Sequence, residues 1–288
     1  MNERAPSPVT FALTGVGGLR LHAQMWDAVG PVRAIVALAH GKSEHAGRYA
    51  HVVRALTSHG YAVYTVDHRG HGRSEGERGV IGRFDDYVED FGLLVRHAKR
   101  GTPGAPLVVV GHSMGGLIAA RYALAQQEEI AALVLSGPAF KIDEGMPGWR
   151  RSLLMFLGRV APGLAAPPTA VGVLARDPEI ERQFAADPLN VNTPTRLGFV
   201  RALLLAGEDA QRRFAELRLP MLLMHGAEDK LTSPRATEAL HDQAPSADKT
   251  LKLWPENRHE IFNDYEKDAV IAEMLAWLDA RFPPLATG

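Results

Sequence analysis

The sequence contains no cysteine, and this absence removes several kinds of chemistry at once. Disulfide bonds, thiolate nucleophiles and cysteine-based metal sites are all excluded, which leaves hydroxyl, carboxylate and imidazole groups for any catalysis. An excess of one charge is also missing, since 32 basic side chains stand against 33 acidic ones. Nucleic-acid binders usually carry a strong basic excess, so we expect no nucleic-acid partner.

Long apolar runs are absent as well. No segment supplies the roughly 20 consecutive apolar residues of a membrane-spanning helix, and residues 1–8 show no basic region followed by an apolar stretch. We therefore expect neither a secretory signal nor a membrane span, and a cytoplasmic location is the default. With 288 residues, of which 46% are hydrophobic and 23% charged, the chain has the composition of a folded globular protein with one large core.

Short apolar runs alternate along the chain with longer segments in which apolar residues recur at helical spacing. The run 107–110 is apolar throughout, which predicts a strand that is covered on both faces. Strands of this kind joined by helices form mostly parallel sheets with helices on both faces, so we predict the α/β class. The predicted strands are 19–26, 34–39, 62–66, 107–110, 131–135, 220–224 and 250–254, and the predicted helices are 49–59, 84–100, 115–126, 235–243 and 267–281.

The alternation of strands and helices stops between residues 139 and 219. Prolines separate short helical pieces throughout this stretch, at Pro147, Pro162, Pro167, Pro168, Pro178, Pro188 and Pro194. A long irregular connection of this kind inside a compact domain usually has a function of its own. We predict a helical cap at 139–219, inserted into an α/β core made of residues 1–138 and 220–288.

A Gly-x-Ser-x-Gly motif at residues 111–115 makes Ser113 the candidate nucleophile. The apolar run 107–110 precedes the motif and a helical pattern follows it, which is the setting of a nucleophile elbow. The glycines permit a sharp turn that exposes the serine hydroxyl, and the backbone N–H of Met114 then faces the charge that develops on the substrate oxygen. The alternative is a tight strand-to-helix corner that contains a serine without a catalytic role.

A second match to the same motif, at residues 72–76, shows that the pattern alone does not identify a nucleophile. Polar and glycine-rich residues surround it on both sides, and no apolar run delivers its serine into a strained turn. We predict that Ser74 is a loop residue.

A serine hydroxyl attacks a carbonyl only when an imidazole accepts its proton, and a carboxylate must orient that imidazole. In the α/β-hydrolase fold these groups follow the serine in the order carboxylate, then histidine. Asp229 follows the strand 220–224 and is the candidate orienter, with neighbouring Glu228 as a competitor. His259 lies in the loop before the last helix and is the candidate base, because His241, the other histidine after Asp229, falls within a helical pattern.

The second oxyanion donor is expected in the loop that follows an early strand. Residues 40–43 follow the run 34–39, and we predict the backbone N–H of Lys42 as this donor. Several histidines lie nearby, at His40, His45, His68 and His71, but none has the helical spacing of a metal-binding motif. We expect neither a metal nor another cofactor.

Five blocks of residues together resemble the monoacylglycerol lipase and lysophospholipase family of α/β-hydrolases. They are residues 40–49, 67–76, 111–116, 225–229 and 259–264. The resemblance implies cofactor-free hydrolysis of a small-molecule ester of a single acyl chain, often a monoacylglycerol, through an acyl-serine intermediate. It also implies that Glu44 and Arg48 meet the polar head of the substrate, and His112 is a further candidate substrate-binding residue. Lys42 and Ser43 depart from the small or apolar residues that are usual at their positions in the family.

Within the predicted cap, residues 149–160 combine an apolar helical face with basic flanks. The apolar face consists of Trp149, Leu153, Phe156, Leu157 and Val160, and the flanking cations are Arg150, Arg151 and Arg159. A basic amphipathic helix of this kind is typical of segments that lie on lipid surfaces. The same pattern also fits a cap helix packed on the core, so transient contact with a lipid surface and simple packing both stay open.

Four other functions compete with a monoacylglycerol lipase. A broad carboxylesterase or a lysophospholipase would use the same catalytic residues. An aminopeptidase would need, in addition, an acidic anchor for the substrate amine, and no motif supplies one. A ligand-binding protein that kept the fold and lost catalysis belongs to a different class, and the apparently complete set of catalytic residues argues against it.

Overall fold

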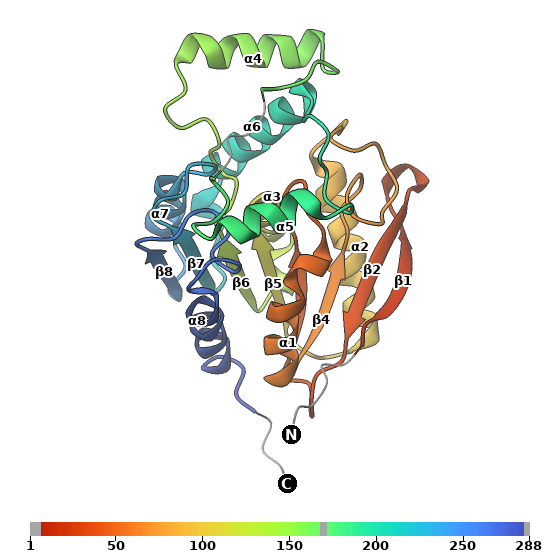
Figure 1. Ribbon diagram of the computed structural model, residues 1–288. Coiled ribbons are helices and arrows are strands. Elements are labelled where there is room, and N and C mark those ends of the chain that lie inside the picture. The colour runs from red at the N-terminus through yellow and green to blue at the C-terminus, as the bar shows by residue number, and fades with distance from the viewer. Residues whose placement is uncertain (1–6, 168–171, 285–288) are drawn as a thin grey trace.

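An eight-stranded sheet forms the centre of the protein in the computed structural model, which describes residues 7–167 and 172–284 (Figure 1). The strands are β1 (Val9–Thr14), β2 (Arg20–Trp26), β3 (Ala34–Ala39), β4 (Tyr61–Val66), β5 (Leu107–His112), β6 (Ala132–Ser136), β7 (Met221–Gly226) and β8 (Lys249–Trp254). Their order across the sheet is β1-β2-β4-β3-β5-β6-β7-β8. β2 pairs antiparallel with both β1 and β4, and the remaining pairs are parallel, so the predicted mostly parallel sheet is confirmed.

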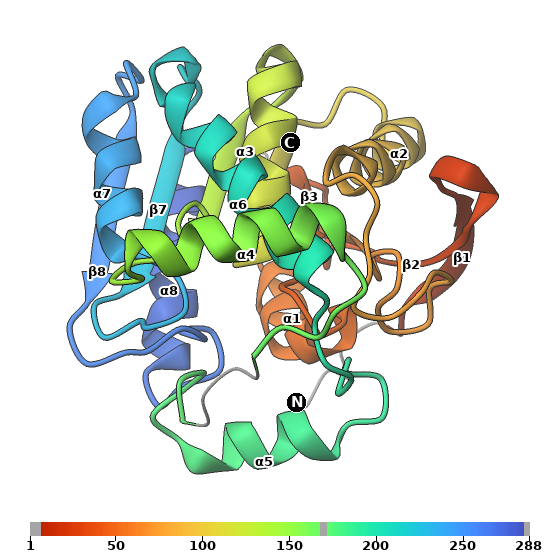
Figure 2. The ribbon, with the colours of Figure 1, turned by 90° about the horizontal axis from the view of Figure 1, so that it is seen from above.

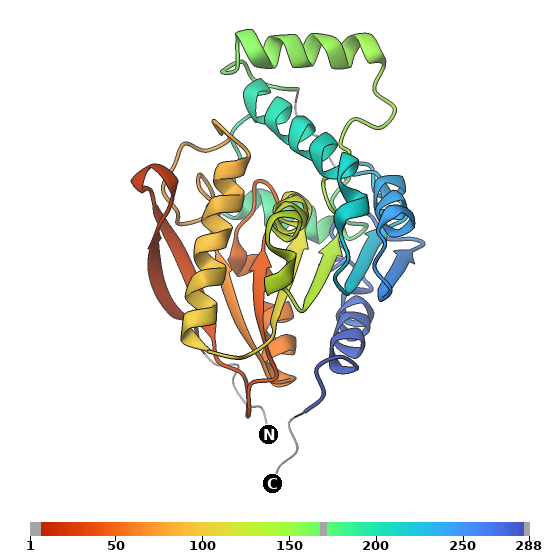
Figure 3. The same ribbon diagram turned by 180° about the vertical axis from the view of Figure 1, so that it is seen from behind.

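Helices cover both faces of this sheet, as predicted. They are α1 (Ala50–Ser58), α2 (Asp85–Gly101), α3 (Met114–Gln126), α7 (Pro234–Gln243) and α8 (Lys267–Asp279), with short 3-10 turns η1 (Val16–Gly18), η2 (Ala46–Tyr49), η3 (Gln127–Glu129) and η4 (Phe214–Glu216). Figure 1 shows α1 and α8 on the near face, and Figure 3 shows the amber helix α2 on the opposite face.

Side chains that alternate along each strand build two separate cores, one on each face of the sheet. In β3, Ala34, Val36 and Leu38 pack with residues of α1 and α8. Ile35, Ala37 and Ala39 pack on the other face with residues of α2, α3 and α7. Since β3 is buried along its whole length, both cores hold the strand ends, and the loops that follow them, in fixed positions.

The predicted cap carries three helices, α4 (Gly148–Val160), α5 (Pro178–Ala186) and α6 (Leu197–Arg212). Figure 1 shows α4 farthest from the sheet with α6 beneath it, and Figure 2, the view from above, shows both helices crossing over the sheet. Asp177 caps α5 by accepting a hydrogen bond from Glu179 N–H, and Pro178 occupies the first turn, where its missing N–H costs nothing. The boundaries of the cap at residues 139 and 219 stay a prediction.

Two features differ from what the sequence predicted or fall outside the described ranges. The strand β1 was not predicted, because it is an edge strand whose residues are mostly exposed or half-buried and whose position is set by pairing with β2. Residues 1–6, where we predict no secretory signal, and Pro168 lie outside the described residues. None of the described helices combines the length and apolarity needed to cross a membrane.

Candidate active site

Ser113 stands at a strained corner between β5 and α3. Its backbone has φ 54° and ψ −119°, a region that residues with a Cβ rarely adopt. Gly115, in the first turn of α3, has no room for a side chain, because a Cβ there would collide with the carbonyl oxygens of Ala39 and His40. The corner therefore packs directly against the end of β3. This is the local geometry that the Gly-x-Ser-x-Gly motif predicts.

His259 and Asp229 form a buried hydrogen-bonded pair. The two atoms His259 Nδ1 and Asp229 Oδ2 lie 2.7 Å apart, and the imidazole N–H donates because a carboxylate can only accept. Burial alone would lower the pKa of His259, but the Asp229 carboxylate raises it above its ordinary value. An imidazole with a raised pKa is a stronger proton acceptor, which is the property that a general base needs.

Further donors fix the Asp229 carboxylate. His225 Nε2 lies 3.0 Å from Oδ2, the Thr232 hydroxyl donates to the same oxygen at 2.8 Å, and the N–H groups of Leu231 and Thr232 donate to Oδ1. Burial alone would raise the pKa of Asp229, yet His259 and His225 hold it well below its usual range. The neighbouring side chain of Glu228 is exposed, so Asp229 is the carboxylate that reaches the histidine.

The nucleophile and the pair meet at the carboxyl ends of the strands. The ring of His112, which precedes Ser113, lies 4.7 Å from the ring of His259 between centroids. A Cβ on Gly137, the residue after Ser136, would touch His259 Nδ1 and Asp229 Oδ2, and the Ser136 carbonyl accepts the Ser113 N–H. Within residues 7–167 and 172–284, no hydrogen bond joins the Ser113 hydroxyl to His259 in this conformation; such bonds often tighten only with substrate.

Two backbone N–H groups lie in segments that adjoin Ser113. Met114 is the first residue of α3, so its N–H has no acceptor inside the helix. The loop after β3 lies against the nucleophile, since a Cβ on Gly41 would be 3.2 Å from Ser113 Cβ. The N–H of Lys42, the next residue, has no acceptor in the described part of the chain. Both groups are available to stabilise an oxyanion.

The three residues that we predicted to bind substrate are all close to this centre, but they are deeply packed. Glu44 is 2% exposed, and its carboxylate already binds protein donors. Arg48 lies between Glu44 and Glu260. Burial lowers the pKa of His112 to about 3, so its imidazole is neutral and contacts the Ser136 hydroxyl. A substrate-binding role for these residues stays a prediction.

Sequence reasoning did not assign roles to two groups that hold Asp229 and His259. His225 is the penultimate residue of β7 and is itself held at Nδ1 by the Thr237 hydroxyl, 2.7 Å away. Its position four residues before Asp229, at a strand end, was a usable signal. Glu260 directly follows His259, but its partner Arg48 lies 212 residues away in the chain, and no local pattern relates the two.

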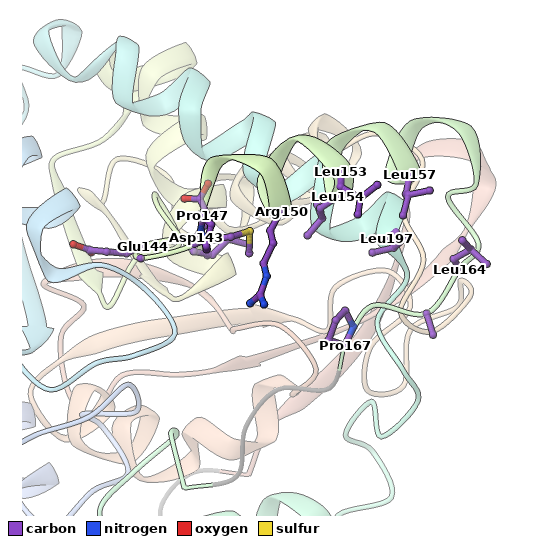
Figure 4. A pocket seen from close by; sticks show the side chains of 14 residues that line it. Asp143, Glu144, Pro147, Arg150, Leu153, Leu154, Leu157, Leu164, Pro167 and Leu197 are labelled. Carbon is purple, nitrogen blue, oxygen red and sulfur yellow. The ribbon is translucent and has the colours of Figure 1, made fainter.

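A cavity of about 720 Å³ lies under α4, between the cap helices. Its walls are mostly apolar and are formed by Leu153, Leu154, Leu157, Leu164, Pro167 and Leu197, with Asp143, Glu144 and Arg150 among the other residues. Figure 4 shows Leu154 and Leu157 of α4 beside Leu197, the first residue of α6. Phe199 of the same helix lies near the ammonium group of Lys42, in the loop 40–43 that is called the oxyanion loop below.

Comparisons with known proteins agree with this geometry. Residues 30–266 match the family model described as serine aminopeptidase, S33. The chain is 38% identical to the monoacylglycerol lipase of Mycolicibacterium smegmatis, over 93% of this chain and 95% of the relative. It is 31% identical to the monoglyceride lipase of Homo sapiens, over 97% and 94% of the two chains.

The chain belongs to the monoacylglycerol lipase family of α/β-hydrolases. A crystal structure of the monoacylglycerol lipase of Paleococcus ferrophilus, 28% identical, superposes with a TM-score of 0.80 and covers 91% of this chain and 99% of that one. The resemblance that the sequence motifs indicated is thereby confirmed, and so is the α/β-hydrolase fold.

Proposed function

We propose that the protein is a carboxylic ester hydrolase acting on esters of single acyl chains, with monoacylglycerol as the first substrate to test. The observation that carries this proposal is the combination of a strained Ser113 at the strand-to-helix corner with the buried His259–Asp229 pair. The names of its relatives, monoacylglycerol lipase and monoglyceride lipase, support the choice of substrate. The cytoplasmic location predicted from the sequence is part of this proposal.

The first half of the reaction forms an acyl-enzyme. His259 Nε2 takes the proton of the Ser113 hydroxyl while Ser113 Oγ attacks the ester carbonyl carbon. The carbonyl oxygen becomes an oxyanion that accepts hydrogen bonds from the N–H groups of Lys42 and Met114. When this tetrahedral intermediate collapses, the bond to the alcohol oxygen breaks, and His259 returns its proton to the leaving glycerol.

The second half frees the enzyme. A water molecule replaces the alcohol, gives a proton to His259 and attacks the acyl-serine carbonyl through a second oxyanion. Collapse releases the fatty acid, and His259 returns the proton to Ser113. Asp229 stays ionised throughout and stabilises the imidazolium that forms twice in the cycle, in keeping with a pKa well below its usual range.

The acyl chain is proposed to occupy the apolar cavity under α4. The cavity lies within the cap, and its lining is mostly apolar, with five leucines, so it can bury an alkyl chain. The helix α6 contributes Leu197 to the cavity wall and Phe199 to the surroundings of the Lys42 ammonium group, so an acyl chain that extends from the nucleophile along α6 would enter the cavity. We therefore expect medium or long acyl chains to be cleaved faster than short ones.

Contact with a lipid surface is proposed for the outer face of α4. Trp149 and Phe156 are 66% and 59% exposed, and Leu153 and Val160 are exposed beside them. Isolated apolar residues are common on protein surfaces, but these four lie together on one helix and form a patch. An exposed patch of this kind favours contact with lipid over the alternative in which this face packs on the core.

The Lys42 side chain supports a second reading, hydrolysis of lysophospholipids. Its ammonium group donates to the Ser43 hydroxyl at 3.0 Å, and no carboxylate of the described ranges forms an ion pair with it. Burial lowers the pKa of Lys42 to about 8. The substitution Lys42→Met keeps the backbone donor and removes the cation, so a lower rate ratio of lysophosphatidate to monoacylglycerol in this variant would favour an anionic head group.

The family description also names a serine aminopeptidase, a function that requires a free carboxylate to hold the substrate amine. The two buried carboxylates nearest the centre, Glu44 and Glu260, are already paired with Arg48. This pairing favours an ester as the substrate.

The experiment that tests the proposal compares three leaving groups, each over a range of acyl chain lengths. A monoacylglycerol, a short-chain and a matched long-chain aryl ester, and lysophosphatidylcholine are incubated with the wild-type protein, and aminoacyl arylamides serve as the peptidase arm. Glyceride hydrolysis that peaks at a medium or long chain supports the lipase reading. Poor glyceride turnover at every chain length, in a protein that a fluorophosphonate probe labels, would contradict it.

A further inference from the structure

A buried ionic cluster joins the oxyanion loop to the loop of the catalytic histidine. Arg48 Nη1 lies 2.5 Å from Glu44 Oε2 and 2.9 Å from Glu260 Oε1, and Arg48 Nη2 lies 2.7 Å from Glu260 Oε2. The three side chains are only 11%, 3% and 4% exposed for Arg48, Glu44 and Glu260. A planar guanidinium that binds one carboxylate through two parallel bonds fixes orientation as well as distance.

One end of the cluster holds the loop that carries the proposed oxyanion donor. Glu44 Oε1 accepts from the backbone N–H of Gly41 at 2.5 Å and from the Tyr49 hydroxyl at 2.6 Å. Gly41 directly precedes Lys42 and packs against Ser113. A displacement of the Glu44 carboxylate would therefore move the Lys42 N–H away from the oxyanion.

The other end holds the base. Glu260 directly follows His259, and its carboxylate accepts from Asn263 Nδ2 at 2.8 Å in addition to the two bonds from Arg48. Arg48 also lies against the ring of Phe184 in the cap helix α5, with 5.0 Å between the guanidinium carbon and the ring centroid. The guanidinium is thus enclosed on several sides.

We propose that Arg48 and Glu260 are positioning residues, which hold the oxyanion loop and His259 at the separation that the reaction needs. This inference rests on the proposed function, because it assigns a role within the same hydrolysis. It differs from the head-group role that the family resemblance implies for Glu44 and Arg48, since every bond described above is made within the protein.

The two roles predict different kinetics. A head-group contact affects only substrates that carry a glycerol, so its loss would raise KM for monoacylglycerol and leave an aryl ester of the same acyl chain unchanged. A positioning role affects the acylation step of both substrates, so its loss would lower kcat on both with little change in KM.

The cluster also sets the electrostatic surroundings of His259. Asp229 binds the imidazole directly, and the His112 ring lies 4.7 Å from it between centroids. Behind these groups, His225 binds Asp229, and Arg48 joins Glu44 to Glu260, the residue after His259. The neighbouring Arg258 guanidinium binds the carbonyls of Gly172 and Ala175 in the cap. Asp229 raises the pKa of His259 most among these groups, and Glu260 and Glu44 raise it further. Removing a negative charge should therefore lower the pKa of His259, and removing the positive charge of Arg48 should raise it.

The test uses Glu260→Gln, which keeps the size of the side chain, together with Arg48→Met and Arg48→Lys. Each variant is assayed with a monoacylglycerol and with an aryl ester of the same chain, over a range of pH. We expect kcat to fall by about tenfold or more on both substrates. The acid limb of the kcat/KM profile should move to lower pH in Glu260→Gln and to higher pH in Arg48→Met, and should stay in place in Arg48→Lys.

Asp90→Asn is the matched control. Asp90 is buried and accepts from Arg69 at 2.7 and 2.8 Å, as Glu260 does from Arg48, but it belongs to α2 and its carboxylate binds the N–H of Val16 in η1. We expect this variant to lose stability without a shift of the acid limb. Circular dichroism and the stoichiometry of fluorophosphonate labelling show which variants are folded, and only these are compared. If Arg48→Met does not fold, the kinetics of Glu260→Gln on the two substrates, compared with Asp90→Asn, still test the positioning role.

Two outcomes would overturn the positioning role. The first is a rise in KM for the glyceride alone, which would show that Arg48 and Glu44 bind the head group of the substrate. The second is a shift of the acid limb in the same direction for Glu260→Gln and Arg48→Met, or an equal shift in Asp90→Asn. A wild-type protein that neither hydrolyses esters nor reacts with the probe is a different result, and it would contradict the proposed function itself.

Discussion

The catalytic edge of the core and the outer face of the cap are built in opposite ways. Around His259, the carboxylates of Asp229, Glu44 and Glu260 are buried, and each binds several protein donors. Along α4, all of which the structure describes, Gly158 is the one buried residue, while Trp149 and Phe156 are exposed. The carboxylates around the histidine are therefore held in place by the protein itself, whereas most of the apolar surface of α4 is exposed to solvent.

The largest effect that separates these regions is expected from the orienting carboxylate. In Asp229→Asn the amide can no longer hold His259 in the tautomer that accepts a proton at Nε2, so we expect kcat to fall by about 10⁴-fold. Glu228→Gln, one residue earlier and exposed, should leave kcat nearly unchanged. Steady-state rates on a soluble aryl ester provide the measurement, and similar losses in both variants would contradict the assignment.

An intermediate effect is expected when the pH is lowered, because acid should reduce the free energy of unfolding. His40, His68, His71 and His112 are buried, and burial holds the pKa of each below 6.5, to about 4 for His71 and about 3 for His112. The unfolded chain therefore binds more protons than the folded one below pH 6.5, and stability falls as the pH drops through this range. Each imidazole contributes up to about 1.4 kcal/mol per pH unit.

Urea unfolding at pH 7.5 and pH 5.5 measures this loss, which we expect to reach roughly 4 kcal/mol in total. A folded His71→Gln variant should show a smaller dependence on pH than the wild type. His241→Gln, at a partly exposed position, serves as the control and should not change the slope. An unfolding free energy that is constant over this pH range would show that these imidazoles are not kept neutral by burial.

The smallest effect is expected from the cap. We predict that the double substitution Trp149→Ser and Phe156→Ser lowers hydrolysis of aggregated long-chain monoacylglycerol severalfold, because it removes apolar surface that contacts lipid. Turnover of a soluble short-chain aryl ester should not change. Liposome cosedimentation measures binding directly, and the double substitution of the exposed residues Val9 and Val29 by serine, outside the cap, is the control. Unchanged cosedimentation would favour the alternative in which this face has no lipid partner.

Local patterns predicted the parts of the molecule that depend on neighbours in the chain. Uniform apolar runs predicted the buried strands, because covering both faces of a sheet requires such composition. A glycine-flanked serine between a strand and a helix predicted the strained corner at Ser113, and the structure has it. The order of the groups then pointed to Asp229 and His259, and the structure brings the two within hydrogen-bond distance.

Features that depend on tertiary contacts could not be predicted in this way. The strand β1 has little apolar signal of its own and is held in place by β2. Arg48 and Glu260 meet across 212 residues of sequence, so their partnership exists only in the folded protein. The amphipathic pattern of α4 fitted both a packed and an exposed apolar face, and only the three-dimensional arrangement of α4 over α6 distinguishes them.

The central claim is that Ser113 cleaves acyl esters with the help of His259 and Asp229. The most direct test is hydrolysis of a monoacylglycerol series, from short to long acyl chains, by the wild type and by Ser113→Ala in parallel. We predict activity that peaks at a medium or long chain in the wild type and falls by about 10⁴-fold or more in the variant. Hydrolysis that survives in a folded Ser113→Ala protein would contradict the account.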